Sequence, residues 1–229
     1  FLQLPEERRR LSHALIDTLV CLHAVDVERV GLADFGRPAG YLERQVRRWS
    51  QQWERSKTRE LPGVDELARR LRAALPTSGP PTIVHGDYRL DNTMMNPEDP
   101  GEIIAVLDWE MSTLGDPLAD VGLFLLYWGQ ADAQIIATGA AIDSQPGFLS
   151  RDEIVERYAT VSGRSVDALD WYVAFASYKL AIIVAGINAR FQMGKTLGEG
   201  FDTMGAMVSG LINSALEQAN KSSIAALRG

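Results

Sequence analysis

The sequence predicts an α+β fold that is mainly helical, with one small strand-loop-strand element in the middle of the chain. Apolar residues recur at helical spacing over most of the 229 residues, as expected for amphipathic helices. Only between residues 82 and 107 do short β-branched runs replace this pattern. The composition, with 46% hydrophobic and 23% charged residues, is that of an ordinary globular protein with a sizeable core.

Three helices are predicted before the middle element. The first spans residues 6–23, and its apolar face recurs at helical spacing through Leu11, Leu15, Leu19 and Leu22. A second helix spans 41–57 and carries Trp49 and Trp53 four residues apart on one face, so both are expected in the core. A third helix spans 64–75.

The middle element consists of two β-branched runs, 82–85 and 103–107, separated by a turn rich in Asn, Pro and Gly. A helix over 118–128 follows. Asp116 directly before Pro117 is typical of a helix start, with Asp as the N-cap and Pro at the first helical position. Because this helix is apolar nearly all round, we expect it to be central.

The rest of the chain predicts three further helices, over 151–161, 166–191 and 200–227, and a break within the second is left open. The most apolar stretch, 180–187, is far shorter than the ~20 residues that span a bilayer, so it predicts a buried helix. No signal-peptide pattern opens the chain. We therefore expect a cytoplasmic protein that does not engage membranes, and the sequence leaves its oligomeric state open.

Charge and cysteine content exclude several classes of function. A formal net charge of −7 argues against a general nucleic-acid binder, which needs a basic face. The single cysteine, Cys21, excludes an internal disulfide and a cysteine-based structural zinc site. Since Cys21 lies in an apolar helical stretch, we expect it to be a small buried core residue.

The chemistry-bearing residues lie in the middle element. Asp87 and Asn92 occupy one loop in the arrangement Asp-x-x-x-x-Asn, and Asp108 follows the next strand. Phosphoryl transfer needs an acceptor hydroxyl oriented by a carboxylate, and a divalent metal held on the phosphates by hard oxygen ligands. A loop carboxylate, a loop amide and a strand-end carboxylate supply such a set.

These residues resemble the aminoglycoside phosphotransferase-like branch of the protein-kinase-like fold. The matching pieces are His85-Gly-Asp87-(x)4-Asn92, Ile-Ala-Val-Leu-Asp108-Trp-Glu and Gly115-Asp-Pro-Leu-Ala-Asp120-Val. The first helix, which ends in Cys-Leu-His23, looks like the helix after the hinge in these enzymes. The resemblance covers essentially the whole chain. It implies the carboxy-terminal lobe of a kinase-like fold, with a small β-hairpin element carrying the catalytic loop.

The resemblance also implies roles for individual residues. Asp87 would be the catalytic base for the acceptor hydroxyl, while Asn92 and Asp108 would hold Mg²⁺ on the phosphates of ATP, or of GTP. Asp120 would brace the backbone of the catalytic loop, and His85 would pack and hydrogen-bond within that loop.

Four neighbouring polar residues are less clearly assigned. Arg89 reaches either a phosphate or substrate, or forms a salt bridge within the loop, and both readings stay open. Glu110 takes the place of the glycine in the Asp-Phe-Gly motif of protein kinases, and it is a second candidate for substrate contact. Asp91 and Asp116 are expected to be structural, because aspartate is common in turns and caps.

A relaxed phosphate-loop pattern over 189–196 is expected to be a decoy. A phosphate loop follows a strand and opens a helix, and its glycines let backbone N–H groups approach the phosphates. This segment follows a predicted helix and is filled by bulky side chains. A helix C-terminus at Gly194 is the better account.

An amino-terminal lobe is expected to be absent from this chain. Such a lobe supplies a glycine-rich loop and a strand lysine for the nucleotide, and neither pattern occurs before His85. The whole of 1–229 is therefore read as one lobe. Its expected segments are the first helix and helical insert (1–80), the catalytic loop, metal-binding strand end and central helix (81–130), and a substrate subdomain (131–229). Such a lobe alone is expected to be inactive.

The expected substrate is a hydroxylated small molecule. Residues 171–201 include three basic residues, Lys179, Arg190 and Lys195, and only one acidic residue, Glu199. A polycationic aminoglycoside needs a cleft lined by carboxylates, so this composition fits it poorly. A neutral or anionic hydroxy metabolite fits better. The motif wording also resembles phosphotransferase domains fused to some acyl-CoA dehydrogenases, which implies hydroxyacyl-type substrates.

Two other functions stay open at this point. One is an inactive kinase-like binding module. The other is a metal-dependent hydrolase with His85, Asp87 and Asp108 as ligands, since His85 and Asp87 two apart on a strand would share a face. Against the hydrolase, the other histidines, His13 and His23, lie far from this loop in the sequence.

Overall fold

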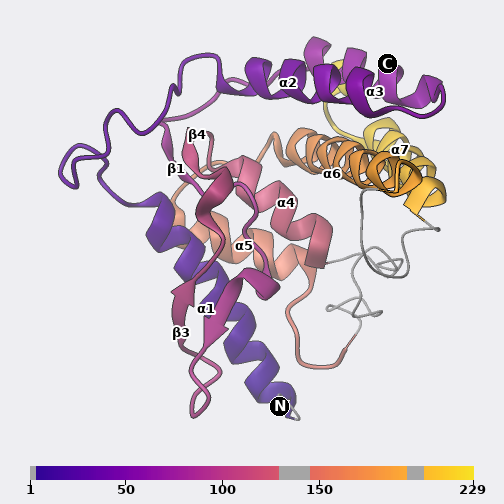
Figure 1. The fold of residues 1–229 in the computed structure, drawn as a ribbon. Helices are drawn as coiled ribbons and strands as arrows, with labels where there is room; N and C mark the ends of the chain where they lie inside the picture. The colour runs from indigo at the N-terminus through magenta and orange to yellow at the C-terminus, as the bar shows by residue number, and fades with distance from the viewer. Residues whose placement is uncertain (1–3, 129–144, 195–203) are drawn as a thin grey trace. The chain divides into compact units, whose positions relative to one another are not determined.

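The computed structural model of the chain describes residues 4–128, 145–194 and 204–229 (Figure 1). Its internal contacts divide the chain into two compact units. The first unit combines Phe1–Ala39 with Gly79–Asp167, and the second combines Gly40–Ser78 with Ala168–Gly229. Each unit joins two separated stretches, whereas the three segments expected from the sequence follow chain order, and that segmentation stays a prediction.

In its described residues the first unit has three helices and two antiparallel strand pairs. The helices are α1 (Pro5–His23), α4 (Leu118–Trp128) and α5 (Arg151–Ser162). The pairs are β1 (Thr82–Val84) with β4 (Thr113–Gly115), and β2 (Thr93–Met95) with β3 (Ile103–Val106). Ile83 lies opposite Leu114, and Thr93 lies opposite Val106. Short 3-10 turns occur at Leu90–Asn92 and Trp109–Met111.

Both predicted strands are confirmed, but their pairing differs from the single strand-loop-strand element expected. Each pairs with a strand of three residues that the sequence analysis missed, β4 for the first and β2 for the second. The strand β1 is equally short, but its Thr-Ile-Val run is β-branched throughout, whereas β2 (Thr-Met-Met) and β4 (Thr-Leu-Gly) have one β-branched residue each. The loop between β1 and β2 therefore runs from one strand pair to the other.

Two helices of the first unit begin with caps that the sequence encodes. Asp116 is buried, and its Oδ1 accepts a hydrogen bond of 3.0 Å from the Leu118 amide, so the expected N-cap role is confirmed. At α5 the Ser150 hydroxyl accepts from the Glu153 amide at 3.2 Å, and Glu153 Oε2 accepts from the Ser150 amide at 2.8 Å. These caps fix where each helix starts.

An aromatic row forms the core under the loop between β1 and β2. The Phe124 ring lies 5.9 Å from the ring of Tyr88 and 5.1 Å from that of Trp128, measured between centroids. Tyr88 is fully buried and donates a hydrogen bond of 2.7 Å to the Leu15 carbonyl of α1. The loop is thus fastened to α1 and α4 through one tyrosine.

The second unit is helical and is built around one long helix. Its elements are α2 (Tyr41–Ser56), α3 (Pro62–Ala73), α6 (Leu169–Gln192), α7 (Met204–Lys221) and α8 (Ala225–Arg228). Figure 1 shows α6 and α7 side by side. Trp49 and Trp53 of α2 are 7% and 2% exposed, which confirms that both are core residues.

Helix α6 is the buried apolar helix that the sequence predicted. It runs unbroken from Leu169 to Gln192. It is long and apolar enough to span a membrane, but 83% of its most apolar window is buried inside the structure. A core helix of a globular fold has the same composition and burial.

Two other expectations need correction. The helix expected over 200–227 is broken between α7 and α8. At the break the Ser222 hydroxyl accepts a hydrogen bond from the Ile224 amide at 3.0 Å and donates one to Asp170 at 2.8 Å. Residues 200–203 lie outside the described part of the chain. Cys21 is exposed rather than buried. It lies off the buried stripe of α1, which runs through Leu11, Leu15 and Leu19.

Phe124→Ala should lower the free energy of unfolding by about 3–5 kcal/mol, because it empties the middle of the aromatic row. Ile104→Ala, at a side chain that is 52% exposed, is the control and should change it by no more than about 0.5 kcal/mol. Urea denaturation measures both. Equal effects of the two substitutions would contradict this account of the core.

Candidate active site

The loop that joins β1 to β2 is held by a buried carboxylate. Asp120, in the first turn of α4, is 0% exposed. Its Oδ2 accepts a hydrogen bond from the His85 amide and its Oδ1 accepts one from the Gly86 amide, both at 2.7 Å. Hydrogen bonds to a charged acceptor are stronger than neutral ones. The expected bracing contact of Asp120 with the loop backbone is therefore present.

Gly86 is needed at the turn where Asp120 holds the loop. Its φ is +84°, in the region that side chains other than glycine rarely adopt. A Cβ atom at this position would lie 2.7 Å from the Met111 carbonyl oxygen. The loop therefore passes directly against the backbone that leads from β3 to β4.

A second histidine, which the sequence analysis set aside as remote, lies against Asp120. His23 is 2% exposed; its Nε2 lies 3.3 Å from Asp120 Oδ2, and its Nδ1 lies 2.9 Å from the Tyr158 hydroxyl of α5. Since a carboxylate only accepts, Nε2 carries the proton toward Asp120. Burial raises the pKa of Tyr158, which keeps its hydroxyl protonated and able to donate to Nδ1. Helices α1, α4 and α5 are thus linked beneath the loop.

His85 supports the loop with both of its ring nitrogens. It is fully buried, and its Nε2 lies 2.8 Å from the Leu107 carbonyl, which only accepts. Its Nδ1 accepts from the Asp87 amide at 3.2 Å. The ring is therefore neutral with the proton on Nε2, and neither nitrogen has a free lone pair for a metal. The hydrolase alternative loses its only nitrogen ligand in this way.

Asp87 and Asn92 lie in direct contact across the loop. Asn92 Nδ2 donates to the Asp87 carbonyl at 2.9 Å and to Asp87 Oδ2 at 3.0 Å. The Asp87 side chain is 24% exposed, whereas Asn92 is buried at 7%. The amide of Asn92 thus points its nitrogen at Asp87 and leaves its oxygen for another partner.

The strand ladder brings Asp108 next to this pair. The Leu107 amide donates to the Asn92 carbonyl at 2.8 Å, one step beyond the pairing of Thr93 with Val106. Asp108 follows immediately, is exposed, and has φ 64° and ψ 57°. It is the one residue other than glycine with positive φ in the described ranges 4–128, 145–194 and 204–229. Such a left-handed backbone costs about 1–3 kcal/mol and occurs mainly at functional sites.

Asn92 and Asp108 together fit a magnesium ion bound with phosphates. Both offer oxygen ligands, which Mg²⁺ prefers, and Mg²⁺ usually takes one or two side chains and fills its remaining positions with water and substrate phosphates. No group of three His, Cys, Asp or Glu side chains that could cage a metal occurs in the part of the chain described. Asn92 and Asp108 are therefore the residues that would hold such an ion.

The less clearly assigned residues lie around Asp87. Arg89 forms ion pairs with both loop aspartates, at 3.8 Å from its Nε to Asp87 Oδ2 and 3.7 Å from its Nη1 to Asp91 Oδ2. Its guanidinium also lies 5.1 Å from the centre of the Tyr127 ring. Glu110 is exposed in the 3-10 turn after Asp108.

Tyr127 belongs to this site and was missed from the sequence. Its pKa is raised to about 12, chiefly by burial and then by the negative charge of Asp87, while the charge of Arg89 and a hydrogen bond with Arg89 lower it. Tyr127 stands in the apolar run of α4, where a tyrosine reads as a core residue. Its position in the sequence does not mark it as a site residue; its contact with Arg89 in the folded structure does.

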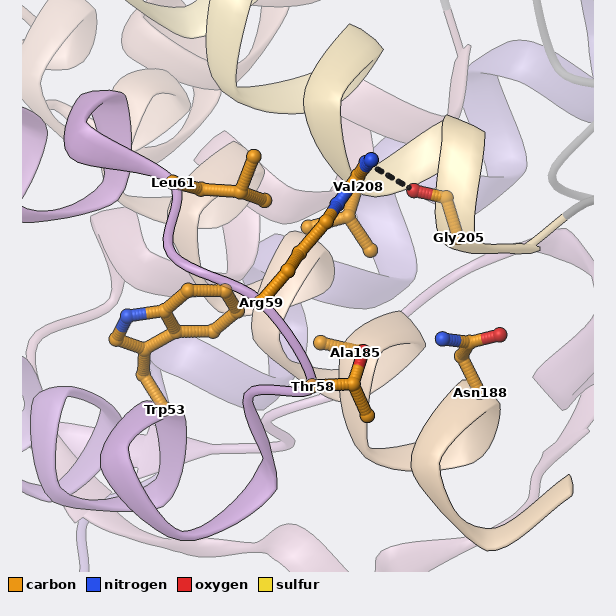
Figure 2. A pocket seen from close by; sticks show the side chains of 8 residues that line it. All are labelled: Trp53, Thr58, Arg59, Leu61, Ala185, Asn188, Gly205 and Val208. Atoms are coloured by element: carbon orange, nitrogen blue, oxygen red, sulfur yellow. Dashed lines mark hydrogen bonds between the residues drawn. The ribbon is translucent and has the colours of Figure 1, made fainter. Parts of the chain in front are cut away.

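The second unit has a small pocket of its own, but it contains none of the predicted site residues (Figure 2). It has about 240 Å³ of empty space and is lined by Trp53, Thr58, Arg59, Leu61, Ala185, Asn188, Gly205 and Val208. Arg59 reaches across it and donates to the Gly205 carbonyl at 2.9 Å.

Of the basic residues expected to favour an uncharged or anionic substrate, Lys179 is buried at 8%, with its ammonium 5.7 Å from the Trp49 ring, and Arg190 is exposed. Lys195 and Glu199 lie outside the described residues.

The helix end expected at Gly194 is confirmed: α6 stops at Gln192, and Gly194 has φ 68° and donates to the Phe191 carbonyl at 2.8 Å.

Comparison with known proteins places this site in a family context. A model described as "Phosphotransferase enzyme family" matches residues 2–154. The chain is 35% identical over 199 residues to acyl-CoA dehydrogenase family member 11 of Rattus norvegicus, covering 85% of this chain and 25% of that protein. It is 32% identical over 220 residues to acyl-CoA dehydrogenase family member 10 of Mus musculus, covering 95% and 20%. The chain thus spans about a quarter of the length of these relatives.

Solved structures have the same fold. An aminoglycoside phosphotransferase candidate from Ralstonia eutropha superposes with a TM-score of 0.89 at 31% identity, covering 97% of this chain and 69% of the other. A choline/ethanolamine kinase family protein from Mesorhizobium loti superposes with a TM-score of 0.63 at 17% identity, covering 96% and 66%. The second likeness concerns the fold alone.

Asp120→Asn should lower the free energy of unfolding by about 2–4 kcal/mol, because an amide keeps only one accepting oxygen for the two loop N–H groups. The Gly86 amide should also exchange its hydrogen faster. Asp34→Asn, at an exposed aspartate of the first unit, is the matched control. Denaturation and amide exchange measure these effects, and an unchanged Gly86 exchange rate would contradict the bracing role.

Proposed function

Because the chain belongs to the phosphotransferase enzyme family and has the fold of kinase-like phosphotransferases, we propose that it transfers the γ-phosphoryl group of ATP, or of GTP, to a hydroxyl group of a small molecule. The contact of Asp87 with Asn92 beside Asp108 is the observation that carries this proposal. It brings a part-exposed carboxylate and two oxygen ligands together at the end of one strand pair.

In this proposal Asp87 is the base. Its Oδ2 is oriented by the Asn92 amide at 3.0 Å, so the carboxylate is held in place to accept the proton of the acceptor hydroxyl as the bond to phosphorus forms. Asn92 and Asp108 would hold Mg²⁺, which supplies positive charge to the phosphates when bound. Asp120 and His85 keep the loop rigid and touch no substrate.

The surface beside the metal ligands supports a nucleotide donor. Met94 lies two residues after Asn92 and Leu107 lies directly before Asp108; their side chains are 47% and 42% exposed. Exposed apolar side chains next to a metal site suit the flat ring of a nucleotide base. The proposal includes a glycine-rich clamp supplied from outside these 229 residues, so the fragment alone would be inactive.

The acceptor in this proposal is a hydroxyacyl-type compound, uncharged or anionic. The names of the relatives, acyl-CoA dehydrogenase family members 10 and 11, support an acyl substrate. Lys179 no longer contributes to this argument, because it is buried against Trp49. Cytoplasmic location and the lack of nucleic-acid and membrane partners also stay proposals.

Asp87→Asn should lower kcat for nucleotide-dependent phosphorylation by about 10²–10⁴-fold, because it removes the base and keeps the side-chain size. The assay uses full-length protein with MgATP and a panel of hydroxy acids, hydroxyacyl thioesters and aminoglycosides. Asp34→Asn should retain the rate. Equal activity of Asp87→Asn and wild type would sink the assignment of the base.

Asp108→Asn should raise the Mg²⁺ concentration needed for half-maximal activity by about tenfold or more, because a charged ligand becomes a neutral one. Since asparagine tolerates the left-handed backbone, the free energy of unfolding should change by less than about 0.5 kcal/mol. A magnesium titration of the rate and a denaturation curve measure the two quantities. An unchanged magnesium requirement would remove Asp108 from the metal site.

A further inference from the structure

Arg89 has an unusual environment for a charged side chain. Its Nε is buried and has no hydrogen-bond partner among the described residues. The nearest carboxylate oxygens, on Asp87 and Asp91, lie 3.8 Å from Nε and 3.7 Å from Nη1, which is beyond hydrogen-bonding distance. The guanidinium is hydrogen-bonded to the Tyr127 hydroxyl, but buried polar groups are nearly always paired, so the Nε–H can take a further acceptor.

Tyr127 holds the guanidinium in this position. The Arg89 Cζ lies 5.1 Å from the centre of the Tyr127 ring, within the range of a cation–π contact. Tyr127 is on α4, whose first turn carries Asp120, so the ring is fixed by the same helix that braces the loop. Arg89 is also hydrogen-bonded to the Tyr127 hydroxyl, on which the charges of Asp87 and Asp91 act as well. The Arg89 guanidinium is therefore oriented by the Tyr127 ring and flanked by the carboxylates of Asp87 and Asp91.

We propose that Arg89 binds an anionic oxygen at the point of transfer, and that Tyr127 is the residue that positions it. This inference rests on the proposed function. Because Arg89 Nε is within 4 Å of the proposed base, a group that meets Asp87 also meets the guanidinium. The fork of an arginine suits the oxygens of phosphate and carboxylate equally well. The anionic oxygen is either an oxygen of the phosphoryl group in transit or a carboxylate of the acceptor.

The contact with Arg89 does not change which bonds are formed and broken in the transfer step. The bond from phosphorus to the leaving oxygen of the nucleoside diphosphate breaks, and a bond from phosphorus to the acceptor oxygen forms. The hydroxyl proton passes to Asp87, and Arg89 keeps all of its protons because a guanidinium is not deprotonated in proteins. The contribution of Arg89 is positive charge beside the reacting oxygens.

A simple salt bridge within the loop is the rival account of Arg89, and a binding measurement separates the two. In full-length protein, the Nε–H resonance of Arg89 is followed by NMR while inorganic phosphate, or acetate as a carboxylate, is added. Its assignment comes from its loss in Arg89→Lys. The proposal predicts a saturable shift with at least one ion. If neither ion shifts the resonance, the proposal is overturned, whether or not the protein transfers phosphate.

Kinetics of the same protein test the catalytic consequence. Arg89→Gln should lower kcat/KM by about 10–100-fold, as expected for the loss of a charged hydrogen bond. An equal loss with neutral and carboxylate-bearing acceptors assigns the contact to the phosphoryl group. A loss confined to KM for carboxylate-bearing acceptors assigns it to the acceptor. Arg89→Lys should recover part of the rate, because it restores the charge without the fork.

Matched variants distinguish a catalytic role of Arg89 from an effect on the fold. Tyr127→Phe keeps the ring but loses the hydroxyl that is hydrogen-bonded to Arg89, so it should lose less of the rate than Tyr127→Leu, which removes both, at an unchanged denaturation midpoint. Arg69→Gln, at an arginine whose side chain is 59% exposed, is the control and should behave as wild type. Wild-type kinetics in Arg89→Gln would overturn the proposal. If the wild type transferred no phosphoryl group from a nucleotide, the proposed function would be wrong, and the NMR titration alone would test the role of Arg89.

Discussion

The Asp120 carboxylate is the interaction on which the rest of the site depends. Two backbone N–H groups of the loop, those of His85 and Gly86, end on its two oxygens at 2.7 Å. A loop between two different strand pairs has no ladder of its own to fix it, and its buried amides need acceptors. One carboxylate at the start of a central helix meets this need. Asp87 and Asn92 take their positions from the backbone that it holds.

This carboxylate is in turn held by groups from other parts of the first unit. His23 of α1 lies 3.3 Å from it, and Tyr158 of α5 lies 2.9 Å from the far nitrogen of that ring. Stacked aromatic rings fill the space beneath the loop. The framework can therefore maintain the positive φ of Asp108, which is unfavourable in isolation for a residue other than glycine. Local strain at this backbone position is offset by the packing and hydrogen bonds of a whole unit.

The sequence predicted most of the helices and the central residue set, because these depend on local patterns. The spacing of Asp87 and Asn92, and the capping pair Asp116-Pro117, are each readable over a few residues. The pairing of strands was not readable, because β2 and β4 are short and lack the β-branched run that marks β1. His23 and Tyr127 were missed as site residues for another reason. Their side chains lie on helices that only the tertiary fold brings to the loop.

The exposure of Cys21 shows the same limit. Its apolar neighbours in the sequence suggested burial, but the face of α1 that packs inward passes through Leu11, Leu15 and Leu19 and leaves Cys21 outside. Arg89 likewise was ambiguous until its distances were known. The sequence gives no sign that its nearest carboxylates lie beyond hydrogen-bonding distance.

The central claim is that the loop oxygens direct phosphoryl transfer from a nucleotide to a hydroxyl rather than to water. Phosphorus NMR of full-length protein with ATP, Mg²⁺ and hydroxyacyl acceptors measures this outcome most directly. The account predicts a phosphate monoester resonance that grows in step with ADP and is absent without acceptor. Release of inorganic phosphate alone, at the same rate with and without any hydroxyl acceptor, would contradict it.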